Sequence, residues 1–243
     1  MSADPTAQPP RAQPTRLGPP EGIGDLRRER LSWARLYFVC DAQPHGEDPE
    51  PLLHAALANG AGMIELRDRE QPAGAVRRSA ATFRRLADTF SALFIVNDDP
   101  RLAQELDADG VHVGQDDMPP AEAREILGPD AIIGLSTHSP EQVEAAQGEP
   151  VDYISVGPIW ETPTKKGRPA TGLDLIRSAA GASRLPWFAI GGIDAGNAAD
   201  VVTAGARRLC VVRAIRDAHE PGDAASALSA RVEAAVRDDG GRG

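Results

Sequence analysis

Residues 151–172 read VDYISVGPIWETPTKKGRPATG, and this stretch contains the unit that decides the fold. Its first six residues are rich in β-branched and aromatic side chains and predict a strand, while a helical pattern begins near Leu173. The residues between them are rich in glycine and proline and predict one long loop. The stretch is therefore a strand, a loop and a helix, and this order recurs along the chain.

Eight short apolar or β-branched runs predict strands, and alanine-rich amphipathic segments between them predict helices. The predicted strands are 36–40, 62–66, 93–96, 110–113, 131–135, 153–156, 187–190 and 208–212. The predicted helices include 51–59, 73–90, 119–127, 140–146, 173–181 and 196–204. This count predicts an α/β fold, a (β/α)8 TIM barrel. A doubly wound open sheet is the competing topology, but the turn CDAQPHG at 40–46 lacks the glycine pattern that such a sheet usually has after its first strand.

The chain ends differ from this pattern. Residues 1–24 are rich in proline and polar residues and predict a disordered tail, which leaves 25–240 as a single barrel domain. Within that domain, residues 25–35 predict a short helix that caps the bottom of the barrel. Cys40 and Cys210 each lie in an apolar run, which predicts buried, reduced thiols.

The net charge of −10 and the pI near 5.0 argue against nucleic acid or an anionic membrane as a partner. No apolar stretch has the length of a membrane span, and the first residues lack the basic-then-apolar order of a signal peptide. We therefore expect a cytoplasmic protein that binds small molecules, with a homo-oligomeric state left open.

Polar clusters follow the predicted strands at the ends where barrels place functional residues. They are ELRDR at 65–69, NDD at 97–99, GQDD at 114–117, STH at 136–138, GGI at 191–193 and VR at 212–213. Asp98 and Asp117 follow neighbouring strands and are candidates to share one Mg²⁺, which takes one or two carboxylates together with substrate phosphate. Helix capping is the alternative, and it is the favoured one for Asp99 and Asp116.

Two anion sites are expected on this rim. Arg67, Arg69 and Lys165 are candidates to hold a diphosphate, with surface ion pairs as the alternative. Gly191 and Gly192, with a helix start expected near Asp194 and Arg213 across from them, are candidates for a monophosphate site. The loop hydroxyls of Thr162 and Thr164 also suit phosphate, although a solvated basic loop is the simpler interpretation.

Several further residues are open to two interpretations. Glu65 either orients the arginines or bonds a ligand amine, and charge balance is equally plausible. His112 is a base or a packed core ring, with packing favoured. His138 is expected near the mouth of the barrel. Trp160 either stacks on a heteroaromatic ring or anchors the loop.

Six motifs taken in order resemble thiamine-phosphate synthase, also called thiamine-phosphate pyrophosphorylase, over residues 36–235. They are IELRDR at 64–69, VNDD at 96–99, GVHVGQDDMP at 110–119, GLSTHS at 134–139, SVGPIWETPTKKG at 155–167 and AIGGI at 189–193. The resemblance implies that 4-amino-2-methyl-5-pyrimidinylmethyl diphosphate is joined to the nitrogen of 4-methyl-5-(2-phosphoethyl)thiazole, with release of diphosphate.

The resemblance also implies roles for individual residues. It implies that Asp98 and Asp117 hold Mg²⁺ and that Lys165, Arg67 and Ser136 are catalytic. The residues implied for the pyrimidine diphosphate are Glu65, Leu66, Arg67, Asp68, Arg69, Asn97, Ser136 and Lys165. The residues implied for the thiazole phosphate are Thr162, Pro163, Thr164, Gly191, Gly192, Val212 and Arg213.

Three positions depart from the pattern of that family. Glu65 stands where glutamine is usual, Arg69 where lysine is usual, and Arg213 where serine is common. The loop 158–172 is expected to close over both substrates and exclude water. A thiazole tautomerase on the same barrel and a non-catalytic sensor of a phosphorylated ligand are the alternatives, and the combination of Asp98, Asp117 and Lys165 argues against the tautomerase.

Overall fold

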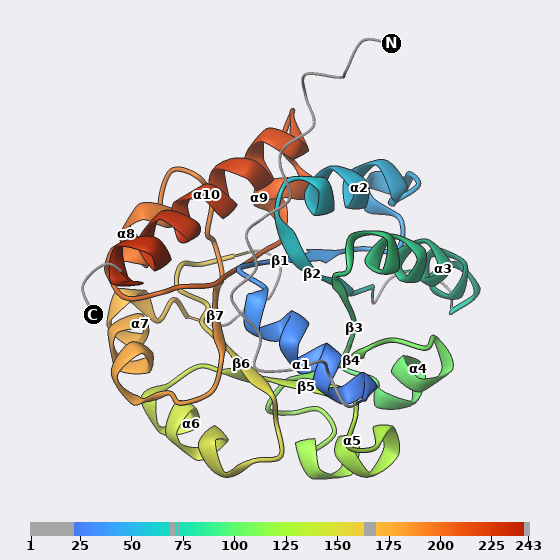
Figure 1. Cartoon of the computed structure of the whole chain (residues 1–243), viewed down its shortest axis with the longest axis horizontal. Coiled ribbons are helices and arrows are strands. Elements are labelled where there is room, and N and C mark those ends of the chain that lie inside the picture. Colours follow the sequence, from blue (N-terminus) through green and yellow to red (C-terminus); the bar gives the residue numbers. More distant parts are fainter. Residues whose placement is uncertain (1–21, 69–70, 72, 163–168, 241–243) are drawn as a thin grey trace.

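The computed structural model describes residues 22–68, 71, 73–162 and 169–240. Eight parallel strands pair in chain order and close into a barrel, and helices surround it (Figure 1), which confirms the predicted (β/α)8 fold. The strands are β1 (Leu36–Cys40), β2 (Ala61–Leu66), β3 (Leu93–Asn97), β4 (Gly110–Val113), β5 (Ile132–Thr137), β6 (Tyr153–Val156), β7 (Trp187–Ile190) and β8 (Leu209–Val211). The helices are α1 (Ile23–Trp33), α2 (Glu50–Ala58), α3 (Ala73–Phe90), α4 (Pro100–Glu105), α5 (Pro120–Leu127), α6 (Pro140–Ala145), α7 (Gly172–Ala182), α8 (Ala198–Thr203), α9 (Arg213–Arg216) and α10 (Pro221–Gly240), with short 3-10 helices at Pro44–Gly46 and Ala146–Gly148.

Several element boundaries differ from the sequence predictions by one or two residues, and two of them concern the start of the domain and the turn beside the cavity. Helix α1 begins at Ile23, two residues before the predicted start of the domain at residue 25. Residues 1–21 lie outside the described part of the chain, so the predicted disordered tail stays a prediction. Helix α8 begins at Ala198 and not near Asp194, because the backbone of Asp194 to Asn197 forms a turn in which the Asn197 side chain accepts from the Asp194 N–H.

Apolar side chains form two cores, one on each face of the sheet. The outer core lies between the strands and the surrounding helices, and Phe38, Ile64 and Phe94 belong to it. The inner core fills the barrel and includes Tyr37, Met63 and Phe188. Because successive residues of a strand point to opposite faces, neighbours such as Tyr37 and Phe38 enter different cores. The inner core leaves its space near the carboxyl ends of the strands for polar side chains.

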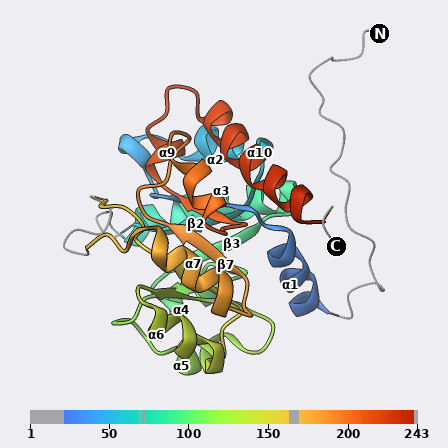
Figure 2. The same ribbon diagram turned by 90° about the vertical axis from the view of Figure 1, so that its left-hand side faces the viewer.

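Helix α1 closes the amino-terminal end of the barrel (Figures 1 and 2). Its Leu31, together with Ala34 just after the helix, belongs to the inner core. This is the capping helix that the charged segment after the tail predicted.

A buried carboxylate ties α1 to the start of β4. Asp109 is 3% exposed and accepts hydrogen bonds from Arg27 of α1 at 2.9 Å and from Arg84 of α3 at 3.0 Å. It also accepts from the backbone N–H of Phe94 in β3 at 2.9 Å. A carboxylate with two guanidinium partners and a backbone donor is fully satisfied despite its burial.

The same arrangement recurs two strands further along. Asp152, just before β6, accepts from Arg28 of α1 at 3.0 Å, from Arg124 of α5 at 2.7 Å and from the backbone N–H of Ile133 in β5 at 2.9 Å. We call these two sets, centred on Asp109 and Asp152, the carboxylate latches. Consecutive arginines of α1 reach the two latches, so the helix is fixed across the end of the barrel.

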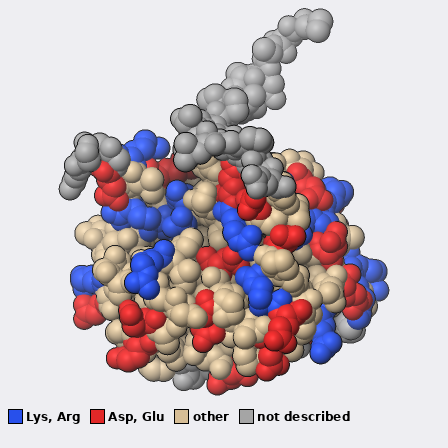
Figure 3. Space-filling model, turned by 60° about the horizontal axis from the view of Figure 1, so that its bottom comes forward, with Lys and Arg blue, Asp and Glu red and all other residues tan. Residues whose placement is uncertain are grey.

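The burial of the two thiols agrees with the sequence prediction. Cys40 and Cys210 are buried free thiols, as predicted, and burial raises the pKa of the Cys40 thiol. Acidic and basic side chains alternate over the face in Figure 3. Among the helices of the described residues, none has the length and apolar character needed to cross a membrane.

Candidate active site

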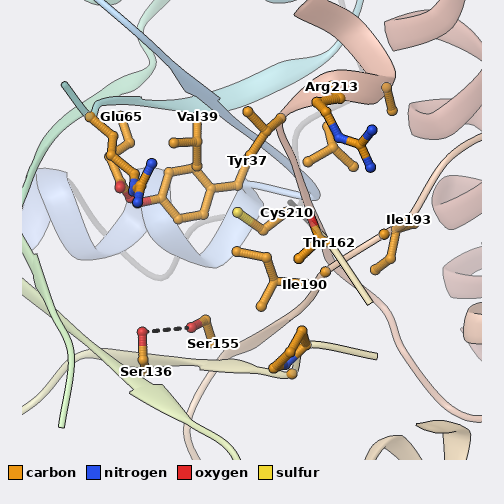
Figure 4. A pocket seen from close by; sticks show the side chains of 18 of the residues that line it. Tyr37, Val39, Glu65, Ser136, Ser155, Thr162, Ile190, Ile193, Cys210 and Arg213 are labelled. Atoms are coloured by element: carbon orange, nitrogen blue, oxygen red, sulfur yellow. Dashed lines mark hydrogen bonds between the residues drawn. The ribbon is translucent and has the colours of Figure 1, made fainter. Parts of the chain in front are cut away.

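A cavity of about 290 Å³ opens at the carboxyl ends of the strands, and every strand of the barrel contributes to its wall. Figure 4 shows Glu65 on one side of it, Arg213 and Ile193 on the other, and Tyr37 and Cys210 between them. The strand residues that line it are Tyr37, Val39, Glu65, Asn97, His112, Ser136, Ser155, Ile190, Cys210 and Val211. The loops after the strands add Arg67, His138, Gly157, Pro158, Thr162, the segment Gly191 to Asp194, the segment Val212 to Ala214, and Asp217.

A hydrogen-bond chain crosses the floor of this cavity. The Tyr37 hydroxyl donates to Glu65 Oε2 and lies 3.1 Å from the Tyr153 hydroxyl. The Tyr153 hydroxyl lies 3.0 Å from Nδ1 of His112, and Nε2 of His112 lies 2.9 Å from Ser136 Oγ. We call these five residues the interior chain. They come from five strands, so the interior chain forms only because the barrel closes.

Ser155 joins the end of the interior chain. Its hydroxyl lies 3.4 Å from Ser136 Oγ (Figure 4) and 3.3 Å from His112 Nε2. Glu65, Ser136 and Ser155 are 2–3% exposed and His112 is 6% exposed, so the hydrogen bonds within this set satisfy polar atoms that are buried. His112 is thus a packed ring, the favoured interpretation, but one with both nitrogens hydrogen-bonded beside the cavity.

Burial sets the protonation of the two tyrosines. The pKa of Tyr37 and the pKa of Tyr153 are both raised well above the ordinary value of 10.0, first by burial and next by the charge of Glu65. Both hydroxyls therefore keep their protons at neutral pH and remain hydrogen-bond donors.

The described residues among those predicted for the pyrimidine diphosphate divide into two groups. Glu65, Arg67, Asn97 and Ser136 line the cavity. Leu66 does not, because it points outward between its neighbours and belongs to the outer core.

Asp68 does not line the cavity either. Its carboxylate accepts from the backbone N–H of Ala42 at 3.0 Å and of Gln71 at 2.9 Å, so it joins the loops that follow β1 and β2. Arg69 lies outside the described residues.

The residues predicted for the thiazole phosphate meet on the opposite wall. Thr162, Gly191, Gly192, Val212 and Arg213 all line the cavity. Pro163, Thr164 and Lys165 lie outside the described residues, as does the central part of the loop that was expected to close.

The glycine pair is required by close packing. Gly191 and Gly192 have φ of 101° and 68°. A Cβ on Gly191 would lie 2.5 Å from Pro158, and a Cβ on Gly192 would lie 2.8 Å from the Trp160 Cβ. The Trp160 N–H donates to Gly191 O at 3.1 Å, and its side chain packs against the outer core, which favours the anchoring interpretation of Trp160.

The two aspartates predicted to bind metal follow neighbouring strands. The backbone N–H of Asp98 donates to His112 O at 2.8 Å, and Asp98 has a φ of 64°, a left-handed conformation that aspartate tolerates. Asp117 folds back so that its Oδ2 accepts from the Gly114 N–H at 2.7 Å. Neither residue caps a helix.

The capping interpretation is confirmed for Asp99 and wrong for Asp116. Asp99 is the N-cap of α4 and its side chain accepts from the N–H groups of Arg101 and Leu102. Asp116 is exposed, and Pro119 is the N-cap of α5. Pro120 occupies the first helical position, so the helix starts further along the chain than Asp116 could cap.

His138 lines the cavity as expected, and its Nδ1 bonds Gly157 O. Tyr37, Tyr153 and Ser155 were not predicted for the site. Each occupies a strand position two residues from another inward-facing residue, so period-2 alternation is the signal that could have found them.

The barrel is closed and parallel, and its cavity opens at the carboxyl ends of the strands. Acidic turns follow two neighbouring strands, and a wall with arginine and glycine lies opposite. This is the architecture of a barrel enzyme for phosphorylated small molecules. The family model described as thiamine monophosphate synthase matches residues 36–215. The chain belongs to this family, which confirms the resemblance found in the sequence motifs.

Relatives and solved structures agree. The thiamine-phosphate synthase of Acidothermus cellulolyticus is 47% identical over 208 residues, covering 85% of this chain and 98% of the relative. That of Mycobacterium tuberculosis (strain ATCC 25177 / H37Ra) is 46% identical over 221 residues, covering 86% and 100%. The solved thiamine phosphate pyrophosphorylase from Pyrococcus furiosus superimposes with a TM-score of 0.76 at 32% identity, covering 86% of this chain and 98% of that one. These comparisons give no support to the tautomerase alternative.

Proposed function

We propose that the protein transfers the 4-amino-2-methyl-5-pyrimidinylmethyl group from its diphosphate to the nitrogen of 4-methyl-5-(2-phosphoethyl)thiazole, giving thiamine phosphate and diphosphate. The observation that carries this proposal is that one cavity has Glu65, Arg67, Asn97 and Ser136 on its wall together with the Gly192 and Arg213 wall. A reaction between two phosphorylated substrates needs both sets beside one reaction centre.

The pyrimidine diphosphate is assigned to the side of Glu65 and Ser136. Asn97 and Ser136 offer hydrogen bonds to a polar heterocycle, and Arg67 offers a cation for the diphosphate. Lys165, assigned by family resemblance alone, adds a second cation. Removing negative charge from the diphosphate makes it a better leaving group, so these cations promote departure.

The thiazole phosphate is assigned to the opposite wall. Thr162 offers a hydroxyl, Gly191 and Gly192 expose their backbone beside it, and Arg213 offers charge. Arg213 is exposed at the start of α9, where its side chain is free to meet an incoming anion. This wall orients the thiazole so that its nitrogen faces the carbon that diphosphate leaves.

Asp98 and Asp117 are assigned to Mg²⁺. Two carboxylates on neighbouring strands suit an ion that takes one or two carboxylates and completes its shell with phosphate oxygens and water, and no cluster of three or more potential ligands occurs among the described residues. When bound, Mg²⁺ supplies positive charge that neutralises the diphosphate oxygens as negative charge develops on them.

The same assignment needs no strong nucleophile from the protein. An electron-rich aminopyrimidine stabilises positive charge on its methylene after diphosphate departs. The protein then needs to orient the two substrates, neutralise the charge of the diphosphate and exclude water. The buried floor formed by the interior chain excludes water from one side. Because both substrates are phosphate esters, we also place the protein in the cytoplasm, where charged metabolites are retained.

The test is to incubate purified protein with both substrates, with Mg²⁺ and with a chelator in its place, and to measure diphosphate and thiamine phosphate. Both products are expected in equal amounts, only when both substrates and Mg²⁺ are present. Single-substrate reactions are the controls. Binding of the thiazole phosphate without diphosphate release would support the sensor alternative and contradict the proposal.

A further inference from the structure

Helix α9 is short and carries Arg213, the arginine of the cavity wall, at its first position (Figure 4). It spans only Arg213–Arg216, and its N-cap residue, Val212, has no polar side chain. A single helical turn has little stability of its own. Ile215 is fully buried in the outer core and fixes one side of the turn. The direction of Arg213 therefore depends on what holds the other end of α9.

Arg216, the last residue of α9, binds two carboxylates. Its Nε and Nη2 donate to Asp217 at 2.7 and 3.3 Å, and its Nη1 donates to Asp41 Oδ2 at 2.8 Å. The pKa of Asp217 is lowered, first by its hydrogen bonding to Arg216, so this carboxylate stays ionised at neutral pH. Three nitrogens of one planar guanidinium group are used, an arrangement that a lysine ammonium does not reproduce.

Asp41 lies on a loop that is itself fixed. Ala42, the next residue, is fully buried; its N–H donates to Asp68 at 3.0 Å, and its carbonyl accepts from Ser79 of α3 at 2.7 Å. The loop after β1 is therefore held by the loop after β2 and by α3. Since β1 pairs with β8, Arg216 ties α9 to this loop across the junction where the first and last strands meet.

Asp217 also lines the cavity, as Arg213 does. The two residues are four apart, and the charge of Arg213 contributes to the lowered pKa of Asp217. A carboxylate in this place competes with an anionic ligand for Arg213. Arg216 donates twice to that carboxylate, and Nε2 of His45, in the 3-10 helix after β1, lies 3.2 Å from its Oδ1. These contacts direct Asp217 toward Arg216 and the loop after β1.

We propose that Arg216 is a positioning residue for a phosphorylated substrate: by holding Asp41 and Asp217 on one guanidinium group it fixes α9 to the loop after β1 and directs Arg213 into the cavity. Asp41 is the second positioning residue. Neither Arg216 nor Asp41 is among the described residues that line the cavity, so their effect on binding passes through α9. The identity of the substrate, the thiazole phosphate, rests on the proposed function.

The first test needs no substrate and measures amide hydrogen exchange in Arg216→Met. The backbone N–H groups of Arg216 and Asp217 donate to the carbonyls of Val212 and Arg213, so their exchange reports the opening of α9. Methionine keeps an apolar stem and makes neither ion pair. The peptide that contains residues 213–217 is expected to exchange about tenfold faster than in wild type. Unchanged exchange in this peptide would overturn the proposal.

Arg207→Met is the matched control. Arg207 also binds a carboxylate of another element through two nitrogens, Asp239 of α10 at 2.6 and 3.2 Å, and its side chain is 33% exposed against 22% for Arg216. It precedes β8 and so lies at the end of the barrel away from the cavity. Exchange in α9 is expected to stay unchanged in this variant. Equal acceleration in both variants would contradict a specific role for Arg216.

The second test separates positioning from stability by steady-state kinetics. Arg216→Met is expected to raise the KM for the thiazole phosphate about threefold to tenfold and to leave kcat and the KM for the pyrimidine diphosphate unchanged, because a misdirected Arg213 weakens binding and not the chemical step. Asp41→Ala keeps the pair of Arg216 with Asp217 and removes only the link to the loop, so it is a second variant with the same expectation. A lower kcat with unchanged KM in both variants would overturn the proposal.

A double-mutant cycle with Arg213→Ser tests whether Arg216 acts through Arg213. Adding Arg216→Met to Arg213→Ser is expected to raise the KM for the thiazole phosphate by less than about twofold more. Full additivity would show that the two residues act independently and would overturn the proposal. Absence of product with wild-type protein would overturn the proposed function and the identity of the substrate, whereas unchanged exchange in α9 would overturn the positioning role.

Discussion

Gly134 of β5 lies directly against the ring of Tyr153 of β6: a Cβ placed on Gly134 would lie 2.2 Å from the Tyr153 Cζ and 2.5 Å from Nδ1 of His112. The missing side chain is what allows the tyrosine and the histidine to meet. Glycine is used here for space, since Gly134 is not among the glycines with positive φ.

Gly134→Ala is therefore expected to lower the free energy of unfolding by about 1–3 kcal/mol, the usual effect of extra volume in a packed core. Urea denaturation measures it. Gly181→Ala is the control, because a Cβ on that helical glycine meets nothing within 4 Å, and alanine there is expected to be neutral or stabilising. Equal stability of Gly134→Ala and wild type would mean that Tyr153 and His112 do not meet as described.

The two tyrosines of the chain are both in the interior chain, which makes their ionisation directly observable. Since their pKa values are raised, no tyrosinate absorbance is expected in the native protein as the pH passes 10, and it should appear only on unfolding. The unfolded chain ionises first, so stability is expected to be unaffected below about pH 10 and to fall as the pH rises above it. Reversible tyrosinate formation in folded protein near pH 10 would contradict the burial of the two tyrosines in the interior chain.

Asp117→Asn tests the metal assignment without removing the acceptor for the Gly114 N–H. Turnover is expected to fall by at least about a hundredfold at fixed Mg²⁺, and the Mg²⁺ concentration for half-maximal rate to rise. Asp116→Asn, an exposed neighbour, is the control. Steady-state rates over a Mg²⁺ series decide between the outcomes, and an unchanged Mg²⁺ dependence in Asp117→Asn would remove this residue from the metal site.

Arg213→Ser replaces the arginine by the serine that the family resemblance leads us to expect at this position. The KM for the thiazole phosphate is expected to rise roughly tenfold to a hundredfold, the loss of one or two charge-assisted hydrogen bonds, while the KM for the pyrimidine diphosphate stays the same. Arg177→Ser removes a charge on the exposed face of α7 and should change neither value. A rise in the KM for the pyrimidine diphosphate alone would reverse the assignment of the two substrates to the two walls.

Asp152→Asn tests the carboxylate latches. Its two guanidinium partners lose their counter-charge at a site where the Asp152 side chain is 10% exposed, so the free energy of unfolding is expected to fall by about 3 kcal/mol. Asp174→Asn removes an exposed ion pair, with 95% of the Asp174 side chain accessible, and is expected to change stability by less than about 1 kcal/mol. Similar thermal melting of the two variants would show that the latch adds little.

The sequence predicted the barrel well because each strand coincides with a local apolar or β-branched run. The runs 36–40, 110–113, 153–156 and 187–190 coincide with β1, β4, β6 and β7, and β5 extends two residues beyond the prediction, to Thr137. Short buried strands between amphipathic helices leave few other ways to hide apolar residues. Helix boundaries next to turns were less certain, as the start of α8 shows.

The site was predicted where one strand or turn contains the whole signal, and missed where several strands combine. The alternation of Glu65 and Arg67 already excludes Leu66 from the cavity, a rule that could have been applied. Asp68 bonds the N–H of Ala42, a contact between two loops that no local pattern reveals. The interior chain depends on the registers of five strands, and only the closed barrel supplies them.

Helix α1 lies across the end of the barrel away from the cavity, so a partner or carrier joined ahead of Ile23 begins on the side opposite the substrates. A bead or a fused enzyme attached there would leave the mouth facing the solution. Attachment at the start of α1 is thus suited to oriented immobilisation, with the catalytic opening directed outward.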